Sequence, residues 1–255
     1  MIFVFVFVLG AIIGSFLNVV LYRLPRGLNF GASRSFCPHC KKILRWYQLI
    51  PIFSFVFQKG RCAFCQKKIS WHYPLVEFLT GIIFVLIFRY FGDFSFLGIL
   101  KIAFLWGVGA ILILACFYDI FYYEIPNGFI ILLFVFGILY FVVEFFQGKN
   151  LNFQSHLLGF LVGGGFLFPF FYFSDETLMG GADVKLMAFL GGFLGFPLVL
   201  MVLASAFIIG GFFASWLLIF KIKKPKDPLP FGPFLILGFF LTLFFGNFVL
   251  NLYLG

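Results

Sequence analysis

The stretch LVLMVLASAFIIGGFFASWLLIF, residues 198–220, contains no charged side chain and is followed at once by the basic run KIKKPK, residues 221–226. About 20 consecutive apolar residues are enough for a helix to cross the hydrocarbon core of a bilayer. Short segments rich in Lys and Arg stay on the cytoplasmic side of the membrane. The stretch therefore predicts a membrane-spanning helix that ends at the cytoplasmic face.

The composition of the whole chain indicates the same fold class. Of its 255 residues, 63% are hydrophobic and 11% are charged, whereas soluble domains carry about 25% charged residues. Apolar runs of near-spanning length recur, which predicts an all-α polytopic membrane protein with about eight transmembrane helices. We expect a first transmembrane helix over 1–22, a cytoplasmic loop domain over 23–72 and a seven-helix core over 73–255. The sixth span begins near Asp183 and looks short, and only Gly195 and Pro197 mark its break from the seventh span. The Gly-rich stretches 163–165 and 191–195 are expected to allow close helix contact. The first apolar run has no preceding basic residue and no A-x-A-like cleavage site, so we expect a retained helix and not a signal peptide.

The basic residues are concentrated in the expected loop domain. Ten Lys and Arg residues fall between residues 23 and 70, and that segment contains no Asp or Glu. We interpret this excess as a topology signal with contact to anionic membrane lipids. The loop carries no recognisable nucleic-acid-binding module, so we expect no nucleic-acid partner. With both basic segments in the cytoplasm, Asp119 and Asp183 each come to the cytoplasmic edge of a span.

Four cysteines in the loop follow the pattern C-x2-C-x21-C-x2-C and are Cys37, Cys40, Cys62 and Cys65. Each C-x2-C presents two thiolates from a tight turn, and two such knuckles supply a tetrahedral set of sulfur ligands that fits Zn²⁺ best. A loop too short for its own core would draw folding energy from a structural zinc ion. Disulfides or redox thiols are an alternative that a reducing cytosol disfavours, and an iron–sulfur or other metal site is another. His39 lies within the first knuckle but is not expected to be a ligand, because four cysteines suffice.

The chain has only nine acidic residues, so each can be considered separately. Glu77 falls in the first turn of the second span, where the helix dipole is a sufficient explanation, although a functional contact stays open. Asp119 and Asp183 lie at matching depth beside spans, where an ionisable group is a functional hypothesis by default. Three others lie near expected turns or span ends, where we expect them to be solvated: Asp93, Glu144 and Asp227.

A pair of carboxylates at one membrane face has a specific chemical use. Two close carboxylates do not both ionise readily, so they share one proton. The ionised member can take a proton from a water that attacks a peptide carbonyl, while the protonated member donates to the carbonyl oxygen. The pair is then an aspartyl protease dyad. Other readings are two aspartates that cap span ends, a transporter with a proton relay, and a non-enzymatic platform for pilus or secretion assembly.

Several motifs, in order along nearly the whole chain, resemble those of the type IV prepilin leader peptidases, which are membrane aspartyl proteases of the GxGD type. The motifs are GSFLNVVLYRLP near the start, the paired C-x2-C knuckles, YPLVEFLTG, D-x5-IPN from Asp119 to Asn127, GGADVKLMAFLG and LPFGPFLILG.

The resemblance implies an activity. Asp119 and Asp183 would be the catalytic pair of an endopeptidase in the inner membrane, with the active site facing the cytoplasm. The substrates would be prepilins or pseudopilins of type IV pili or type II secretion, cut after a glycine that ends a short basic leader. Many members also methylate the new N-terminal amine with S-adenosylmethionine, and the cysteine-bearing loop is associated with that bifunctional form. No Gly-rich fingerprint locates a methyl-donor site, and the sequence leaves the cofactor-binding residues and the oligomeric state open.

The chain departs from the family pattern at Ala182, where the G-x-G-D motif has its second glycine. If the backbone there needs a positive φ, alanine would be strained. If only close approach is needed, one methyl group is tolerated. Lys185 recurs in the family motif, and we interpret it either as an anchor at the cytoplasmic edge or as a charge that acts on Asp183.

Overall fold

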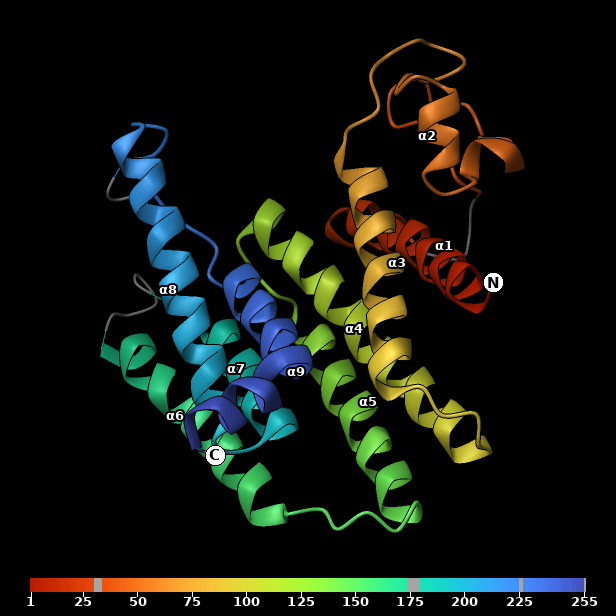
Figure 1. Cartoon of the computed structure of the whole chain (residues 1–255). Coiled ribbons are helices and arrows are strands. Elements are labelled where there is room, and N and C mark those ends of the chain that lie inside the picture. The colour runs from red at the N-terminus through yellow and green to blue at the C-terminus, as the bar shows by residue number, and fades with distance from the viewer. Residues whose placement is uncertain (30–33, 174–178, 225–226, 255) are drawn as a thin grey trace. The chain divides into compact units, whose positions relative to one another are not determined.

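The chain folds into helices joined by short connections (Figure 1). The computed structural model describes residues 1–29, 34–173, 179–224 and 227–254. Within these ranges the only extended pairing is two isolated β-bridges, one between Phe36 and Ile43 and one between Arg61 and Lys68. The helices are α1 (Ile2–Arg23), η1 (Leu24–Arg26), η2 (Trp46–Leu49), α2 (Phe53–Phe57), α3 (His72–Phe91), α4 (Phe96–Tyr122), α5 (Asn127–Phe146), α6 (Phe153–Phe173), α7 (Gly181–Leu194), α8 (Leu198–Ile219) and α9 (Gly232–Leu254).

Seven of these helices, α1, α3, α4, α5, α6, α8 and α9, are long and apolar enough to cross a membrane. The chain is therefore a multi-pass membrane protein, as its composition predicts. The expected sixth span corresponds to α7, which has 14 residues. At 1.5 Å per residue it is about 21 Å long, which is short of the roughly 30 Å hydrocarbon core. The sequence predicts a short helix at this position, and the structure confirms it.

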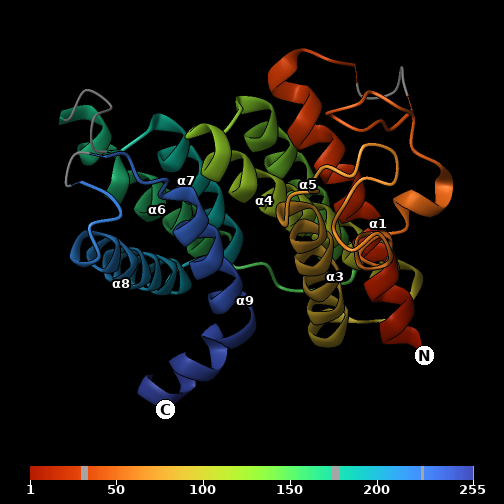
Figure 2. The ribbon, with the colours of Figure 1, turned by 90° about the horizontal axis from the view of Figure 1, so that it is seen from above.

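The chain forms two compact units, Met1–Leu114 and Ala115–Gly255, with the boundary inside α4. In the first unit α1 packs along α3, and both views in Figures 1 and 2 show the two helices side by side. Gly14 allows this close approach, because a Cβ at that position would lie 2.7 Å from the Cα of Glu77. The α3–α4 contact is made by Trp106, whose ring stacks on Phe84 at 5.0 Å and whose Nε1–H donates to the Phe84 carbonyl.

In the second unit the short helix α7 packs against α5, α6, α8 and α9, and Figure 2 shows it beside α6. The contact with α6 depends on small residues, as the Gly-rich stretches predict. A Cβ at Gly163 would lie 2.6 Å from the carbonyl oxygen of Met187. The α7–α8 break expected at Gly195 and Pro197 is also confirmed, since Gly195 has a φ of +81° that favours glycine. This central position of α7 matters because its first turn carries Asp183.

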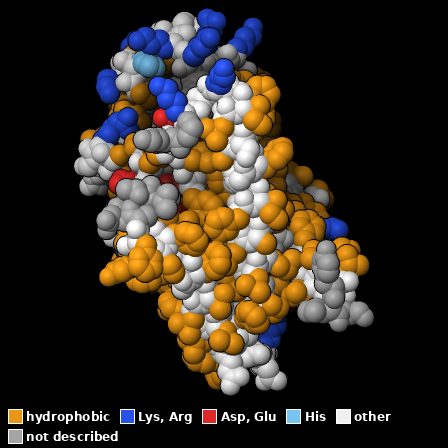
Figure 3. Space-filling view, turned by 90° about the vertical axis from the view of Figure 1, so that its left-hand side faces the viewer, with side chains coloured by type: hydrophobic (Ala, Val, Ile, Leu, Met, Phe, Trp, Pro, Cys, Tyr) orange, Lys and Arg blue, Asp and Glu red, His pale blue; other side chains and the backbone are white. Residues whose placement is uncertain are grey.

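Large hydrophobic side chains cover much of the helical surface, and Figure 3 shows one broad face of this kind. Exposed examples are Ile208 on α8, at 71%, and Ile138 on α5, at 59%. In water such a continuous apolar surface would be unfavourable. Contact with lipid chains removes that cost, which agrees with the membrane assignment.

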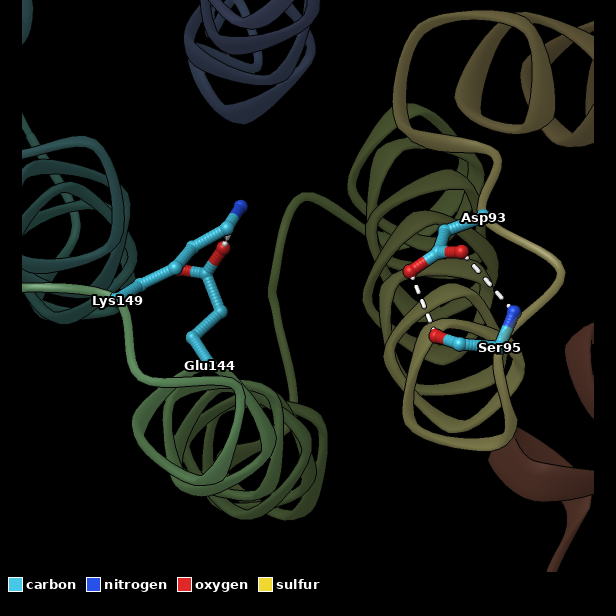
Figure 4. A network of polar contacts seen from close by, with 4 residues as sticks. All are labelled: Asp93, Ser95, Glu144 and Lys149. Carbon is cyan, nitrogen blue, oxygen red and sulfur yellow. Dashed lines mark hydrogen bonds and ion pairs between the residues drawn. The ribbon is translucent and has the colours of Figure 1, made fainter.

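Two of the three acidic residues expected to be solvated, Asp93 and Asp227, are exposed and have local hydrogen-bond partners. Asp93 Oδ1 accepts the backbone N–H of Ser95 at 3.0 Å, and its Oδ2 accepts the Ser95 hydroxyl at 2.7 Å (Figure 4). Asp227 Oδ2 accepts a backbone N–H from Lys224. Glu144 corrects the expectation, because it is buried at 9% exposure and forms an ion pair with Lys149 at 3.0 Å. Burial of this carboxylate is made possible by the nearby ammonium group.

Candidate functional site

Asp119 lies in the last turn of α4 and is buried, with 5% of its surface exposed. Its Oδ2 accepts the backbone N–H of Gly232, the first residue of α9, at 3.0 Å. The first N–H groups of a helix have no partner within the helix and carry a partial positive charge. The start of α9 therefore both orients the Asp119 carboxylate and stabilises its negative charge.

Asp183 lies in the first turn of α7 and is half-buried. Gly180 is the N-cap of this helix, and its backbone N–H hydrogen-bonds the Asp183 carboxylate. This is the backward contact that an acidic side chain makes in a capping box, although here the N-cap itself has no side chain to reciprocate. The chain fold thus holds Asp183 at a helix N-terminus.

Both predicted aspartates lie in the second unit. The carboxylate of Asp119 lies near enough to that of Asp183 to act on it electrostatically. They are 64 positions apart in the chain, Asp119 on α4 and Asp183 on α7. Two carboxylates in such proximity can divide one proton between them, which gives the site both an acid and a base.

A hydrogen bond ties the two aspartate-bearing motifs together. Lys185 Nζ, on α7, donates to Asn127 Oδ1, at the start of α5, at 2.9 Å. Asn127 closes the segment that follows Asp119 along the chain. Of the two interpretations of Lys185, the contact favours the anchor, because the ammonium is directed to an amide on another helix.

Ala182 does not strain the backbone. It is the second residue of α7, and it is not among the described residues with positive φ. A helical backbone accepts alanine better than glycine. The departure from the family pattern at this position is therefore compatible with the local structure, and the second glycine of the motif is not needed for a left-handed conformation here.

Gly232 is the residue of this site that the sequence reasoning did not single out. A Cβ at this position would lie 2.6 Å from Asp119 Oδ2 and 3.1 Å from Ile125 Cδ1. A larger side chain fits there only if the Asp119 carboxylate or the helix start shifts. The signal in the sequence was the G-P pair in LPFGPFLILG, since a proline just inside a helix marks its N-terminus. What that N-terminus contacts was not readable from the sequence.

The two cysteine knuckles of the first unit have matching backbones. In each, the N–H of the first cysteine donates five residues ahead, Cys37 to the Lys42 carbonyl at 3.0 Å and Cys62 to the Lys67 carbonyl at 2.9 Å. The residue after the second cysteine then has positive φ in both, at 59° for Lys41 and 57° for Gln66. The sequence showed the repeated spacing, and the structure shows that both copies fold alike.

The four knuckle thiols converge on one point. Cys37, Cys40, Cys62 and Cys65 have Sγ atoms that all lie within 4.8 Å of one another. Zn–S bonds of about 2.3 Å in a tetrahedron place sulfurs about 3.8 Å apart, which this cluster matches closely. The Cys37 and Cys65 sulfurs are 4.0 Å apart, too far for a disulfide bond of about 2.05 Å. His39 is not part of the described cluster, as expected. The cluster is able to hold a metal ion.

The surroundings of the thiols differ between the knuckles. Burial raises the pKa of Cys37 to about 11. Burial also acts to raise the pKa of Cys62, but the backbone N–H groups of Cys65 and Phe64 and the neighbouring thiols outweigh it and lower the pKa to about 7. Backbone N–H groups directed at sulfur favour the thiolate, which is the form that binds metals.

Comparisons with known proteins agree with this arrangement. The family model described as "Bacterial Peptidase A24 N-terminal domain" matches residues 8–91, and the model described as "Type IV leader peptidase family" matches residues 106–215. No solved structure matches the chain.

Curated relatives match over almost their whole length. A prepilin leader peptidase/N-methyltransferase of Bacillus subtilis is 31% identical over 97% of this chain and 96% of its own. One of Aeromonas hydrophila is 29% identical over 99% and 93%, and one of Legionella pneumophila is 28% identical over 95% and 91%. With two family models and a relative that is 31% identical over 97% of this chain, the chain belongs to the prepilin leader peptidase/N-methyltransferase family.

Proposed function

We propose that this protein is a membrane aspartyl endopeptidase that removes the leader of prepilin-like proteins, with Asp119 and Asp183 as its catalytic pair. The observation that supports this most directly is the electrostatic contact between the two carboxylates in one compact unit. The seven-helix segment 73–255 is the protease core in this proposal, and the carboxylates act without a covalent intermediate.

The pair holds a single proton between substrate-binding events. The ionised carboxylate accepts a proton from a water molecule as the water oxygen attacks the carbonyl carbon of the leader glycine. The protonated carboxylate donates its proton to the carbonyl oxygen, and the collapse of the tetrahedral intermediate then needs a proton on the leaving amine. The N–H of Gly232 keeps Asp119 in place while its charge changes.

The same protein methylates the new N-terminal amine in our proposal. S-adenosylmethionine supplies a methyl group on a positively charged sulfur. The amine nitrogen forms the new N–C bond as the C–S bond breaks, and it loses one proton. The first unit contains a cavity of about 360 Å³ with polar and aromatic walls, which fits a donor of this size.

The metal of the four-cysteine cluster is zinc in this proposal, and its role is structural. Four cysteine ligands close the tetrahedral shell and leave no open position for a substrate or water. Cys37, Cys40, Cys62 and Cys65 would hold the two knuckles together, because the segment between α1 and α3 contains few buried apolar side chains.

We assign the protein to the inner membrane with the catalytic pair at the cytoplasmic face. The support is the charge pattern, since the loop over 23–70 and the run after α8 are both rich in Lys and Arg. Anionic lipid headgroups contact these segments in this orientation.

The test is mass spectrometry of the N-terminus of a co-expressed prepilin. Wild type is expected to remove the leader and to add a methyl mass shift. Asp119→Asn and Asp183→Asn should each lower the cleavage rate by about 10³-fold or more at unchanged protein level. The amide of Asn can neither accept the proton of the attacking water nor donate a proton to the carbonyl oxygen. Asp93→Asn is the matched control, because Asp93 is exposed in the first unit and caps a local turn there. Cleavage that survives in either dyad variant contradicts the proposed pair.

A further inference from the structure

The short helix α2 (Phe53–Phe57), in the loop between α1 and α3, presents an exposed apolar face. Phe53 is 60% exposed, Val56 is 64% exposed and Phe57 is 81% exposed. These residues are spaced i, i+3 and i+4, so they lie on the same side of the helix. The helix has the sequence FSFVF and contains no charged residue. We call Phe53, Val56 and Phe57 the α2 face.

Two contacts fix α2 beside the point where α3 begins. Ile52, the N-cap of α2, donates its backbone N–H to Glu77 Oε2 at 2.7 Å. The ring of Phe55 packs against the ring of Trp71, with 4.7 Å between the centroids. Trp71 directly precedes α3, and Glu77 lies about 9 Å further along it, at 1.5 Å per residue. Because α3 is long and apolar enough to span the membrane, α2 lies at the depth where this span begins.

The backbone of Ile52 shows that the start of α2 is firmly held. Ile52 has a φ of +63°, which is a rare conformation for a β-branched residue. Such a conformation persists only where the surrounding structure fixes it. The hydrogen bond to Glu77 is a contact of this kind, so the position of α2 against α3 is set by the fold.

Two exposed tryptophans flank the α2 face. Trp71 is 76% exposed and contacts α2 through Phe55. Trp46 is 75% exposed and lies in η2, which packs against α2. Tryptophan is enriched at membrane–water interfaces, because its ring is apolar and its N–H reaches polar groups. The residues around α2 are thus those of an interfacial segment.

The charged residues near the α2 face all have one sign. Lys59 and Arg61 follow α2, Arg45 precedes η2, and all three are exposed. The whole segment 23–70 contains no Asp or Glu. Anionic phospholipid headgroups attract Lys and Arg residues close to a membrane surface. An apolar face with a basic border is therefore complementary to an anionic bilayer.

We infer that the α2 face docks on an anionic phospholipid surface, with Phe53, Val56 and Phe57 among the upper acyl chains and with Lys59 and Arg61 against the phosphates. An interfacial helix buries its apolar face in this way. The bilayer is already within reach, because the loop is tethered to it at both ends by α1 and α3. A short apolar face is then sufficient, since the tether raises its effective concentration at the membrane. The inference goes beyond the proposed function and requires neither leader cleavage nor methylation.

The experiment is photolabelling of the full-length, zinc-loaded protein in nanodiscs with two diazirine probes, one soluble in lipid and one soluble in water. The nanodiscs contain either phosphatidylcholine alone or phosphatidylcholine mixed with phosphatidylglycerol. Peptide mass spectrometry gives the ratio of lipid-phase to water-phase labelling at Phe57. In the anionic nanodiscs this ratio should be as high as at Ile208, an exposed apolar residue of the α8 span. In the neutral nanodiscs it should be lower by about fivefold or more, because the headgroup charge is lost.

A pair of double variants tests the charge pairing. Lys59→Gln combined with Arg61→Gln should remove the difference between the two lipid compositions. The matched control is Lys221→Gln combined with Lys224→Gln, which removes two exposed positive charges after α8 and should keep the difference. Metal content and a single size-exclusion peak show whether each variant is folded, and the wild-type measurement needs no variant.

Labelling of Phe57 from water alone in the anionic nanodiscs overturns the inference, and so does a ratio that does not depend on lipid charge. If neither probe reaches Phe57, protein covers the α2 face and lipid docking is refuted. Protection that appears only when a prepilin is added would identify the substrate as the occupant and also refute it. Leader cleavage measured on the same samples separates the two proposals. An active protein with a water-exposed α2 face refutes the docking alone, and a docked but inactive protein refutes the proposed function alone.

Discussion

Replacement of Gly232 by alanine tests whether the start of α9 positions the catalytic pair. The backbone N–H that bonds Asp119 Oδ2 at 3.0 Å is kept, but the new Cβ would lie 2.6 Å from the same oxygen. Ordinary contacts of a Cβ begin at 3.4 Å, so the carboxylate has to retreat by about 0.8 Å (3.4 minus 2.6) or the helix has to shift by as much.

A displacement of about 1 Å at a reacting group can lower a rate by about 10²-fold. We therefore expect Gly232→Ala to lower kcat for leader cleavage by roughly 10–100-fold, which corresponds to about 1.4–2.7 kcal/mol in the activation barrier. KM should change much less, because substrate contacts outside the reacting groups are retained. The unfolding temperature should fall only slightly, since one methyl group at a helix start has room to be accommodated by a small shift.

The assay is the rate of leader removal from a purified prepilin in detergent, followed by gel mobility and mass spectrometry over a range of substrate concentrations. Gly211→Ala is the matched control, because a Cβ at that glycine on α8 meets nothing within 4 Å. It should cleave at the wild-type rate. If Gly232→Ala also cleaves at the wild-type rate, the positioning argument is wrong. If it loses activity only because it unfolds, the measured unfolding temperature will reveal this.

Three further substitutions test the fold around the sites. Cys37→Ser should remove most of the bound zinc, measured by elemental mass spectrometry, and should expose the loop to limited proteolysis, because the cluster loses one of its ligands. Gly163→Val should destabilise the α6–α7 pair by several kcal/mol, seen as a large fall in unfolding temperature, because its Cβ would lie 2.6 Å from the Met187 carbonyl oxygen. Lys185→Met removes an exposed hydrogen bond to Asn127, so its cost should stay within about 1 kcal/mol and cleavage should fall by less than tenfold.

The sequence by itself determined the membrane class, the positions of the seven long apolar helices and the four cysteines that form the cluster able to hold a metal ion. These features depend on residues that are close together in the chain. The run 198–220 is long and apolar enough by itself to span a membrane. Each C-x2-C knuckle places its two thiols close together, whatever the rest of the loop does. The short α7 and the break at Gly195 were also readable, because glycine and proline interrupt the apolar pattern.

Only the tertiary structure decided what lies opposite each functional side chain. Asp119 meets the N–H of Gly232, which is 113 positions later in the chain, and no local pattern encodes that contact. In the same way, Asn18 and Glu77 line one cavity only because α1 packs along α3. Periodicity and spacing in the sequence indicate which face of a helix or strand is apolar. The hydrogen-bond partner of a buried polar group depends instead on how elements that are distant in the chain pack together.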